Sequence, residues 1–274
     1  MSTEPKVING IPCYAPELAH ENKDYPADHF EQLFKLEAKH FWFRSRNKII
    51  QKLLTKFLPP HKTSKILEVG CGTGYVLSGL SKFPNYRLTG ADLHIKGLIF
   101  AKKRLPQTPF VQVDFRRLPF YHEFDAVGAF DVLEHIEEDE EAIKSAHQAL
   151  KPHGFFMITV PQHRWLWSQQ DEAAYHKRRY TRRELCEKLK KNGFTIRFSS
   201  SFVCFLLPLM LISRLRQKKI SAGHKEREYN YDELRISRFI NVILRCVMRM
   251  DEWFIQHGIS LPFGGSIIIV SQKK

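Results

Sequence analysis

The sequence predicts an α/β protein built around a doubly wound, largely parallel β-sheet, and three observations carry this prediction. An apolar run that ends in Glu-Val-Gly leads directly into a glycine-rich turn within residues 65–76. An acidic residue, Asp92, ends the next apolar run, 18 residues after Gly74. Strand-like and helix-like segments then alternate from residue 65 to residue 160. This alternation is the order in which a doubly wound sheet is assembled.

The turn after the first strand has the residues needed to hold a ligand. Its pattern is Glu68-x-Gly70-x-Gly72-x-Gly74, and glycine lets the backbone turn sharply and lets a ligand approach it closely. An acid at the end of the following strand, here Asp92, is placed to accept both hydroxyl hydrogens of a ribose. The residues therefore predict a nucleoside-containing ligand at the carboxyl edge of the sheet.

The elements follow in order along the chain. Residues 1–28 mix Pro, Asn, Gly and charge without a period and are expected to form an extended arm. Helical spacing of apolar residues predicts helices within 29–58, which Pro59-Pro60 ends. Further helices are expected at about 76–81, 96–104, 138–150 and 182–193. Strands are expected at 66–69, 87–91, 111–113, 126–130, 155–160, 194–200 and 266–270.

The composition limits the kind of protein. With 274 residues, 43% of them hydrophobic, the chain can bury one substantial core, so we expect one α/β domain with additions. Lys and Arg outnumber Asp and Glu by 43 to 29, which favours nucleic acid, anionic lipid or an acidic substrate as partner. Five scattered cysteines without a Cys-x-x-Cys motif argue against a disulfide framework and a zinc site, and favour the cytoplasm.

No part of the chain is expected to cross a membrane. The amino terminus lacks the charged and then apolar pattern of a signal peptide. The longest apolar run, residues 202–212, is far shorter than the ~20 residues that a spanning helix needs. We therefore expect a cytoplasmic protein, with peripheral contact to the inner membrane face as its closest approach to lipid.

The glycine pattern, Asp92, the segment 111–115 and the strand 124–131 together resemble the class I S-adenosylmethionine-dependent methyltransferases, from about residue 40 onward. The resemblance implies S-adenosyl-L-methionine as cofactor and a seven-stranded Rossmann-like sheet whose last strand is antiparallel, between the fifth and the sixth. It implies that the glycine loop packs against the amino-acid part of the cofactor, Asp92 binds the ribose and Asp114 the adenine amino group. The implied cofactor residues are Glu68, Gly70, Cys71, Gly72, Thr73, Gly74, Asp92, Leu93, Asp114, Phe115, Phe130 and Asp131. A Rossmann dehydrogenase is the alternative.

The resemblance divides the chain into four parts. Residues 1–60 form an amino-terminal arm and helical lid, 61–202 the cofactor-binding core, 203–262 an amphipathic helical insert, and 263–274 the last strand of the core. In this family the region around residues 40–47 lies over the cofactor entrance, so Trp42 and Arg44 or Arg46 are expected to line a lid. The alternative is an aromatic patch that packs the leading helix on the sheet.

The insert is the main departure from the family, which often joins its sixth and seventh strands by a short turn. It begins with an apolar run at 203–212, which basic residues follow: Arg214, Arg216, Lys218 and Lys219. Its second half repeats Ile236, Phe239, Ile240, Ile243, Val247, Met250 and Phe254 at helical spacing, with Arg235, Arg238, Arg245 and Arg249 between them. Basic amphipathic helices suit an anionic membrane surface. A helical cap on the core or a dimer interface is the alternative.

Histidines supply the candidate catalytic groups. His176 lies in an irregular, aromatic-rich loop, residues 162–181, and Asp171 is placed to orient its imidazole as a general base. His135, just after the fourth strand, is the second candidate, and the alternative is that it caps a helix. His163 shares the aromatic loop, whereas His153 lies at the wrong edge of the sheet. The sequence has no cluster of cysteine and histidine residues that would hold a metal tightly, so we expect no bound metal. A divalent ion held by Asp and Glu side chains is the alternative.

The aromatic loop, the histidine and the run Arg-Tyr-Thr-x-x-Glu-Leu at 179–185 look like the ubiquinone-pathway O-methyltransferases. The predicted function is therefore O-methylation of a lipid-linked or amphipathic small molecule at an anionic membrane surface. One alternative is a nucleic-acid or protein methyltransferase, disfavoured because residues 130–135 lack an Asn-Pro-Pro-Tyr or Asp-Pro-Pro-Tyr loop. The other is a non-catalytic, cofactor-binding regulatory protein. The residues do not indicate an oligomeric state.

Overall fold

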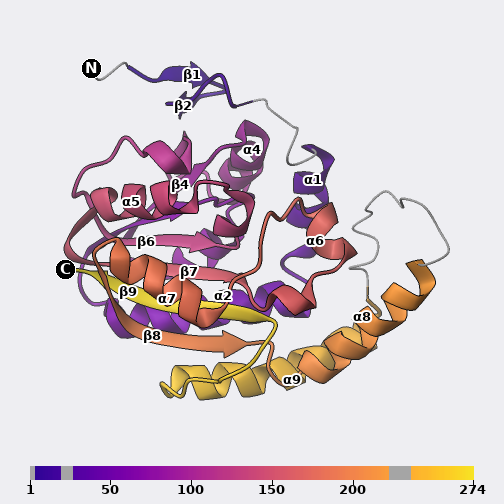
Figure 1. The fold of residues 1–274 in the computed structure, drawn as a ribbon. Coiled ribbons are helices and arrows are strands. Elements are labelled where there is room, and N and C mark those ends of the chain that lie inside the picture. Colours follow the sequence, from indigo (N-terminus) through magenta and orange to yellow (C-terminus); the bar gives the residue numbers. More distant parts are fainter. Residues whose placement is uncertain (1–3, 20–26, 222–235) are drawn as a thin grey trace.

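The computed structural model describes residues 4–19, 27–221 and 236–274, and it contains a mixed sheet in the strand order β1-β2-β5-β4-β3-β6-β7-β9-β8 (Figure 1). The seven strands of the core are β3 (Ser64–Val69), β4 (Tyr86–Asp92), β5 (Phe110–Gln112), β6 (Phe124–Phe130), β7 (Leu150–Pro161), β8 (Phe194–Phe202) and β9 (Ser266–Lys273). Strands β5, β4, β3, β6 and β7 pair in parallel, whereas β9 runs antiparallel between β7 and β8. The predicted doubly wound sheet and its antiparallel last strand are confirmed.

Helices cover both faces of the sheet. On one face lie α2 (Phe41–Phe57), α3 (Tyr75–Leu80) and α4 (Ile95–Arg104), and on the other α5 (Asp139–Ala149) and α7 (Arg182–Lys191). Neighbouring residues of β3 show how each strand serves both layers, because Ile66 belongs to the first core and Leu67 to the second. Burial on both faces explains why the strands read as continuous apolar runs in the sequence.

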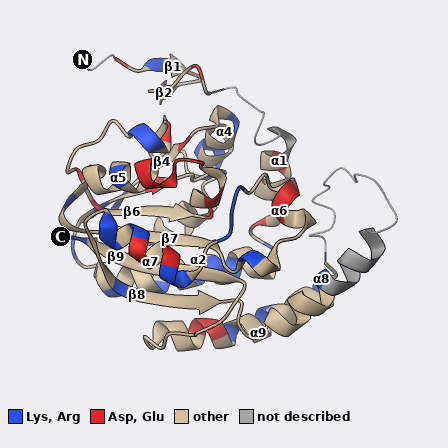
Figure 2. Cartoon of the chain, in the orientation of Figure 1, with Lys and Arg blue, Asp and Glu red and all other residues tan. Residues whose placement is uncertain are grey.

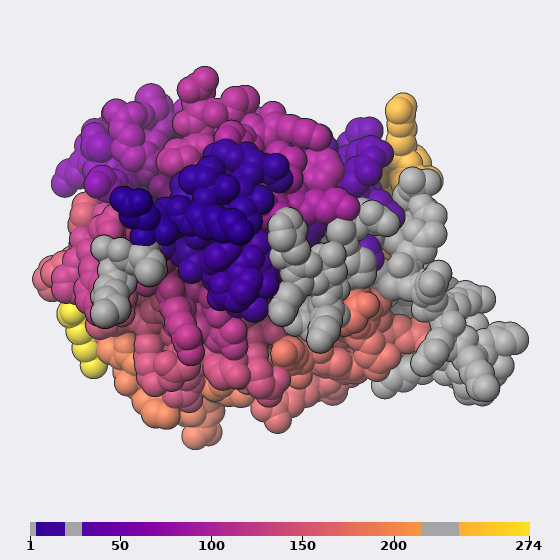
Figure 3. All heavy atoms as spheres, turned by 90° about the horizontal axis from the view of Figure 1, so that it is seen from above, coloured from indigo at the N-terminus to yellow at the C-terminus, as the bar shows by residue number. Residues whose placement is uncertain are grey.

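An amino-terminal hairpin adds two strands to the seven expected. The sequence predicts only an extended arm here, but β1 (Lys6–Ile8) and β2 (Ile11–Cys13) pair with each other, and Cys13 of β2 pairs with Gln112 of β5. The Gln112 side chain accepts a hydrogen bond from the Ala15 backbone N–H at 3.1 Å and donates one to the Ala15 carbonyl at 2.8 Å. Figure 3 shows this indigo segment lying against the magenta part of the chain. Strands of three residues carry too little periodicity to be recognised in the sequence.

The remaining helices lie before the core and in the insert. Helix α1 (Ala27–Leu36) precedes α2, and α6 (Gln169–Ala173) lies in the aromatic loop. Short 3₁₀ turns occur at η1 (Phe115–Arg117), η2 (Leu133–His135) and η3 (Arg164–Leu166). The insert forms α8 (Leu207–Ser221) and α9 (Arg238–Gln256) beside the edge strand β8, with α8 reaching beyond the sheet (Figure 1).

Helix α9 is attached to α2 through polar contacts. The Asn241 side chain accepts a hydrogen bond from the Phe41 backbone N–H at 2.8 Å and donates one to the Lys39 carbonyl at 2.9 Å. Arg245 donates to the Ser45 hydroxyl at 2.8 Å and pairs with Glu252. Within the described part of the chain, no helix combines the length and the apolar character needed to cross a bilayer.

The first turn of α2 makes the stability of the fold depend on pH. His40 caps this helix, since its side chain accepts a hydrogen bond from the Trp42 backbone N–H at 3.3 Å. Burial lowers the pKa of His40 from 6.5 to about 4. Between these two pH values the unfolded chain takes up a proton that the folded chain does not bind, so the free energy of unfolding falls as the pH falls.

We expect His40→Asn to reduce this pH dependence, because asparagine can cap the helix but does not titrate. Urea denaturation between pH 6.5 and 4 measures how steeply the free energy of unfolding falls as the pH falls. This slope should be smaller in the variant than in the unaltered protein, by up to about 1.4 kcal/mol per pH unit. Equal slopes in the two proteins would show that His40 is not the buried neutral group described here.

Candidate active site

One cavity of about 790 Å³ at the carboxyl edge of the sheet gathers nearly all of the predicted site residues. The three catalytic candidates His176, His135 and Asp171 line it. So do the predicted cofactor residues Glu68, Gly70, Cys71, Gly72, Thr73, Asp92, Leu93, Asp114, Phe115, Phe130 and Asp131. Gly74 alone among them is not part of the lining, because it begins α3 and packs against Ala101.

The glycine loop forms an open cradle. Gly70, Gly72 and Gly74 all have positive φ angles, of +70°, +51° and +73°, a region that other residues rarely adopt. A Cβ on Gly70 would lie 2.3 Å from a methyl group of Val132, whereas one on Gly72 would meet no described atom within 4 Å. The space beside Gly72 therefore lets a ligand approach the backbone.

Two acids lie where a nucleoside would be bound. Asp92 ends β4 and is 5% exposed, and its carboxylate accepts hydrogen bonds from the backbone N–H groups of Gly72 and His94, both at 2.8 Å. Asp114 accepts three bonds from the Arg116 guanidinium and one from its backbone N–H. Asp92 therefore also supports the glycine loop. The sequence predicts only its contact with ribose, so this second role is a finding of the structure.

Polar contacts tie the cradle to the leading helices. The Thr73 hydroxyl donates to Glu37 and accepts from Arg104 at 2.8 Å, so its side chain supports the loop. Arg46 of α2 pairs with Asp131 at the end of β6, and its guanidinium lies 4.6 Å from the centre of the Trp42 ring. Of the two arginines considered for a lid, Arg46 lines the cavity and Arg44 is exposed.

These residues fit S-adenosyl-L-methionine. The cavity has room for a nucleoside and an amino-acid chain, the glycine turn is open at Gly72, and Asp92 is at the strand end that meets a ribose. Glu68 is fully buried beside the loop, and its Oε2 has no hydrogen-bond partner among the described residues. Its burial raises the pKa of Glu68 well above the ordinary range. The bound cofactor would supply an electrophilic methyl group.

The predicted pair of Asp171 and His176 is present in the same cavity. Asp171 Oδ1 lies 2.9 Å from His176 Nδ1, and a backbone bond of 2.8 Å joins the same two residues. An ionised carboxylate only accepts hydrogen bonds, so Nδ1 carries the proton and the lone pair of Nε2 is available as a base. The loop is held to η2 because the Lys177 N–H donates to the Glu134 carbonyl at 2.8 Å.

Asp171 is a buried hub. Its side chain is 1% exposed and accepts two bonds from Arg179, at 2.6 and 3.1 Å, and two from Ser168, which caps α6. Burial by itself raises the pKa of Asp171, but the hydrogen bonds from His176 and Arg179 outweigh it and hold this pKa well below the usual range. The carboxylate is therefore charged at every pH at which the protein would be assayed.

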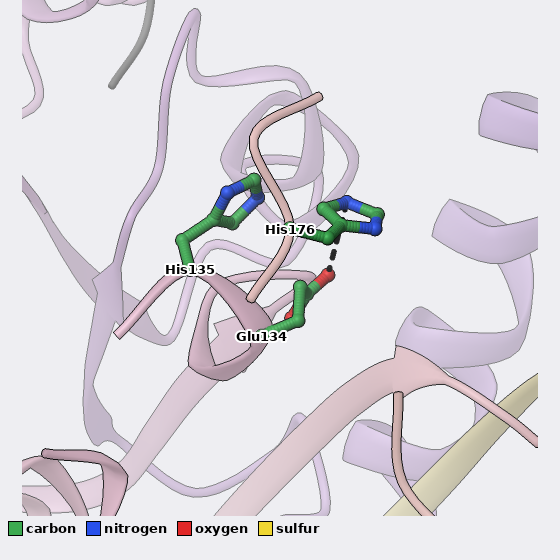
Figure 4. A group of neighbouring side chains, drawn as sticks. All are labelled: Glu134, His135 and His176. Carbon is green, nitrogen blue, oxygen red and sulfur yellow. Dashed lines mark ion pairs between the residues drawn. The ribbon is translucent and has the colours of Figure 1, made fainter. Parts of the chain in front are cut away.

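A second group gathers around His176. Glu134 Oε1 lies 4.0 Å from His176 Nε2, and the rings of His135 and His176 are 4.8 Å apart (Figure 4). Neither carboxylate oxygen of Glu134 has a hydrogen-bond partner in the described structure, and burial followed by repulsion from Asp131 raises the pKa of Glu134. Burial and the neighbouring His176 lower the pKa of His135 to about 3, so that its ring is neutral.

Glu134, His135 and His176 together form a donor set that a divalent cation could use. One ligand atom from each of the three lies within 4.8 Å of the others, and Asp171 orients the far side of the His176 ring, as in many metal sites. The sequence did not predict this cluster because Glu134 and His135 are 41 residues or more from His176. The prediction that no metal is bound stays a prediction.

Two further residues line the site. Glu134 follows β6 at the edge where such sheets bind ligands, and the sequence already indicates this position for Asp131 and Glu134. Arg214, which the sequence places among the basic residues of a membrane surface, instead lines the cavity and lies 3.7 Å from Asp171. That expectation is corrected for Arg214, because its position on α8 turns the side chain inward.

A doubly wound sheet with a glycine cradle and a strand-end acid defines a Rossmann-like domain that binds a nucleoside-containing cofactor. Residues 41–197 match the family described as a methyltransferase domain. Since this match spans more than half of the chain, the protein belongs to that family, and the resemblance to class I S-adenosylmethionine-dependent methyltransferases is confirmed.

Curated relatives are similar over part of their length. A demethylmenaquinone methyltransferase of Chlorobaculum tepidum is 29% identical over 135 residues, which are 49% of this chain and 54% of that protein. A ubiquinone biosynthesis O-methyltransferase of Dechloromonas aromatica is 33% identical over 103 residues, 35% of this chain and 44% of that protein. The chain therefore spans about half the length of the curated relatives it matches.

Solved structures share the fold at low identity. Phosphoethanolamine N-methyltransferase 2 of Haemonchus contortus, in complex with S-adenosyl-L-methionine, has a TM-score of 0.53 at 18% identity and aligns over 81% of this chain and 52% of its own. The [4+2]-cyclase SpnF has a TM-score of 0.54 at 18% identity and aligns over 82% of this chain and 81% of its own. A cyclase among these structures shows that the fold does not decide the reaction.

We expect Asp92→Ala to weaken the binding of S-adenosylhomocysteine by about tenfold or more, because the ribose hydroxyls lose a charged acceptor and Gly72 loses its support. Isothermal titration calorimetry measures this affinity. Asp125→Ala is the matched control, since Asp125 bonds Lys65 and Lys151 outside the cavity. Unchanged affinity in the Asp92 variant would contradict its assignment to the ribose.

Proposed function

We propose that the protein transfers the methyl group of S-adenosyl-L-methionine to an oxygen of a lipid-linked or amphipathic small molecule. The observation that carries this proposal is the position of the His176–Asp171 pair, which opens into the same cavity as the cofactor cradle. Methyl transfer needs the nucleophile in line with the sulfonium methyl, and a hydroxyl nucleophile also needs a base. His176 Nε2 is that base, and Asp171 orients it and stabilises its charged form.

The walls of the cavity support an amphipathic acceptor. Apolar side chains at the start of the insert and aromatic residues of α2 line the same cavity as the glycine loop; they include Val203, Leu206, Leu209, Met210, Phe41 and Trp42. Polar groups lie around His176 in this cavity, among them Asp171 and Glu134. A molecule with a hydroxyl at one end and an apolar body would match both regions. Two of the similar proteins are named as methyltransferases of demethylmenaquinone and of ubiquinone biosynthesis, and this similarity supports the same class of acceptor.

The outer face of α9 supports docking to a membrane surface. Phe239, Ile243, Met250 and Trp253 fall on one side of the helix and are 75%, 46%, 46% and 52% exposed. Figure 2 shows α9 as largely uncharged, and the exposed Arg238 and Arg249 lie beside the apolar residues. Apolar side chains flanked by arginine suit the headgroup boundary of an anionic membrane.

The charge of this surface differs from the prediction. Arg214 and Arg245 point inward, because Arg214 lines the cavity and Arg245 pairs with Glu252. The side chains of Arg216, Lys218 and Lys219 and the whole of Arg235 lie outside the described residues. Docking would therefore depend mainly on the apolar face of α9, with arginines adding ~1 kcal/mol each near anionic lipid.

The activity is tested by incubating the protein with S-adenosyl-L-methionine labelled in its methyl group and with cellular lipid, protein and RNA fractions kept separate. We expect label in the lipid fraction. Label in protein or RNA would favour the alternative macromolecular substrate, and no label in any fraction, despite cofactor binding, would favour a regulatory protein.

We expect His176→Ala to lower methyl incorporation by about 100-fold or more while leaving the affinity for S-adenosylhomocysteine unchanged, because the variant lacks only the base. His135→Ala should have a milder effect, since the neutral His135 ring is not held by a carboxylate. A larger loss in the His135 variant would place the base at the end of β6 instead.

Activity should survive treatment with EDTA, because His176 acts as a base with its own lone pair. Incorporation should be the same before dialysis against the chelator, after it, and after Mg²⁺ or Zn²⁺ is added back. Loss that a divalent ion restores would show that Glu134, His135 and His176 hold a cation. It would also show that the cation, instead of His176, activates the acceptor.

We expect the protein to sediment with phosphatidylglycerol vesicles at low salt and much less with phosphatidylcholine vesicles, because arginines meet anionic headgroups. The double variant Phe239→Ser, Trp253→Ser should stay in the supernatant, since it loses two exposed apolar side chains of α9. Tyr121→Ser, which removes a side chain that is 70% exposed outside the insert, should sediment normally. If the unaltered protein does not sediment with phosphatidylglycerol vesicles, the apolar face of α9 does not dock on a membrane, and a dimer interface is the alternative.

A further inference from the structure

Arg214 of α8 brings a positive charge into the cavity from the insert. Its side chain is 12% exposed, and Nη1 lies 3.7 Å from Asp171 Oδ2. Nη1 is buried and makes no hydrogen bond with any residue that the structure describes. A guanidinium with an unused donor inside a cavity is costly unless a ligand pairs with it.

The neighbouring carboxylate already has its partners. Asp171 accepts two hydrogen bonds from Arg179, one from His176 and two from Ser168. Its single negative charge therefore lies between the guanidinium groups of Arg179 and Arg214. Arg179 donates a hydrogen bond to each of the two carboxylate oxygens. Burial and repulsion from Arg179 lower the pKa of Arg214 to about 10, even though Asp171 acts in the opposite direction.

Four other acids that line the cavity are either paired with another arginine or favoured in their neutral form. Asp131 pairs with Arg46, and Asp114 is held by Arg116. Burial raises the pKa values of Glu68 and Glu134 well above the ordinary range, which favours their neutral forms. None of these four acids pairs with Arg214, and the ion pair that Arg214 makes with the described residues is the one with Asp171, which already has its own partners.

The same stretch of chain supplies an apolar wall. Val203 and Leu206 precede α8, and Leu209 and Met210 lie on it within a turn or so of Arg214; all four line the cavity. A ligand anion at Arg214 would thus have an apolar surface beside it and His176 close by, since His176 and Arg214 both contact Asp171.

We propose that the acceptor carries an oxyanion, a carboxylate or a phosphate, on an apolar body, and that Arg214 binds this oxyanion. The inference rests on the proposed function and narrows its substrate class from amphipathic molecules to acidic ones. Arginine suits the role because its planar fork donates paired hydrogen bonds to carboxylate and phosphate oxygens. The insert would then select the acceptor, while the core binds the cofactor.

The test measures binding of small probes by calorimetry to the protein saturated with S-adenosylhomocysteine. The probes are octyl phosphate, octanoate, octanol and inorganic phosphate, the first three below their aggregation limits. We expect octyl phosphate and octanoate to bind about tenfold or more tightly than octanol, because each adds a charged hydrogen bond. Inorganic phosphate should bind more weakly than octyl phosphate, since it has no apolar body.

Arg214→Met should remove the preference for the charged probes and leave the affinity for octanol unchanged, and Arg214→Lys should keep part of it. Arg87→Met is the matched control, because Arg87 is an exposed arginine on β4 outside the cavity, and it should behave like the unaltered protein. The affinity for S-adenosylhomocysteine shows whether each variant folds. If the Met variant fails to fold, the probe preference of the unaltered protein and of the Lys variant still decides.

Equal binding of octanol and octyl phosphate by the unaltered protein would overturn the inference and leave the proposed methyl transfer intact. A preference for charged probes that Arg214→Met retains would also overturn it, because another group would then bind the oxyanion. Failure of the proposed function has a different signature. The protein would then bind S-adenosylhomocysteine and the probes as expected but would transfer no label.

Discussion

The buried carboxylate of Asp171 is the constraint on which the arrangement of the candidate site depends. Asp171 lies in the aromatic loop and forms a capping box with Ser168, the N-cap of α6. It also accepts hydrogen bonds from the side chains of Arg179 and His176. A carboxylate that is 1% exposed is tolerated only because these donors satisfy it. Because these partners share one acceptor, their positions are tied to one another, and His176 is held where it lines the cavity. The same carboxylate brings Arg214 of the insert to the site.

The sheet explains why this loop is close to a cofactor cradle. Parallel strands β3, β4 and β6 end at one edge, where the glycine loop, Asp92 and Asp131 lie, and β7 runs to the same edge before the aromatic loop begins. Cores on both faces hold these strand ends in place. The insert between β8 and β9 closes a side of the cavity with apolar residues of α8. The cofactor cradle and the apolar wall at α8 therefore come from different parts of the chain.

Sequence reasoning predicts the core well because its signals are local. Continuous apolar strands, the glycine turn at 70–74 and the acid at Asp92 are each contained in a short stretch, and all occupy the expected places. The Asp171–His176 pair is also local, since His176 is the fifth residue after Asp171. Contacts between distant segments could not be predicted. The cluster of Glu134, His135 and His176 depends on how the aromatic loop folds back over η2, and the inward direction of Arg214 depends on the rotation of α8 about its axis. The hairpin β1–β2 is too short to show a period, and its pairing with β5 depends on Gln112.

In the proposed function, Asp171 positions the base without contributing to cofactor affinity, and one substitution separates these two properties. Asp171→Asn preserves the shape of the side chain but removes its charge, so residue 171 no longer fixes the tautomer of His176 or stabilises its protonated form. The most direct measurement is single-turnover transfer of a labelled methyl group into the lipid fraction, made alongside calorimetry of S-adenosylhomocysteine binding. If Asp171 positions the base, transfer falls by about 100-fold or more while the affinity for S-adenosylhomocysteine is retained. Transfer at the rate of the unaltered protein in a variant that binds the cofactor normally would contradict this role of Asp171.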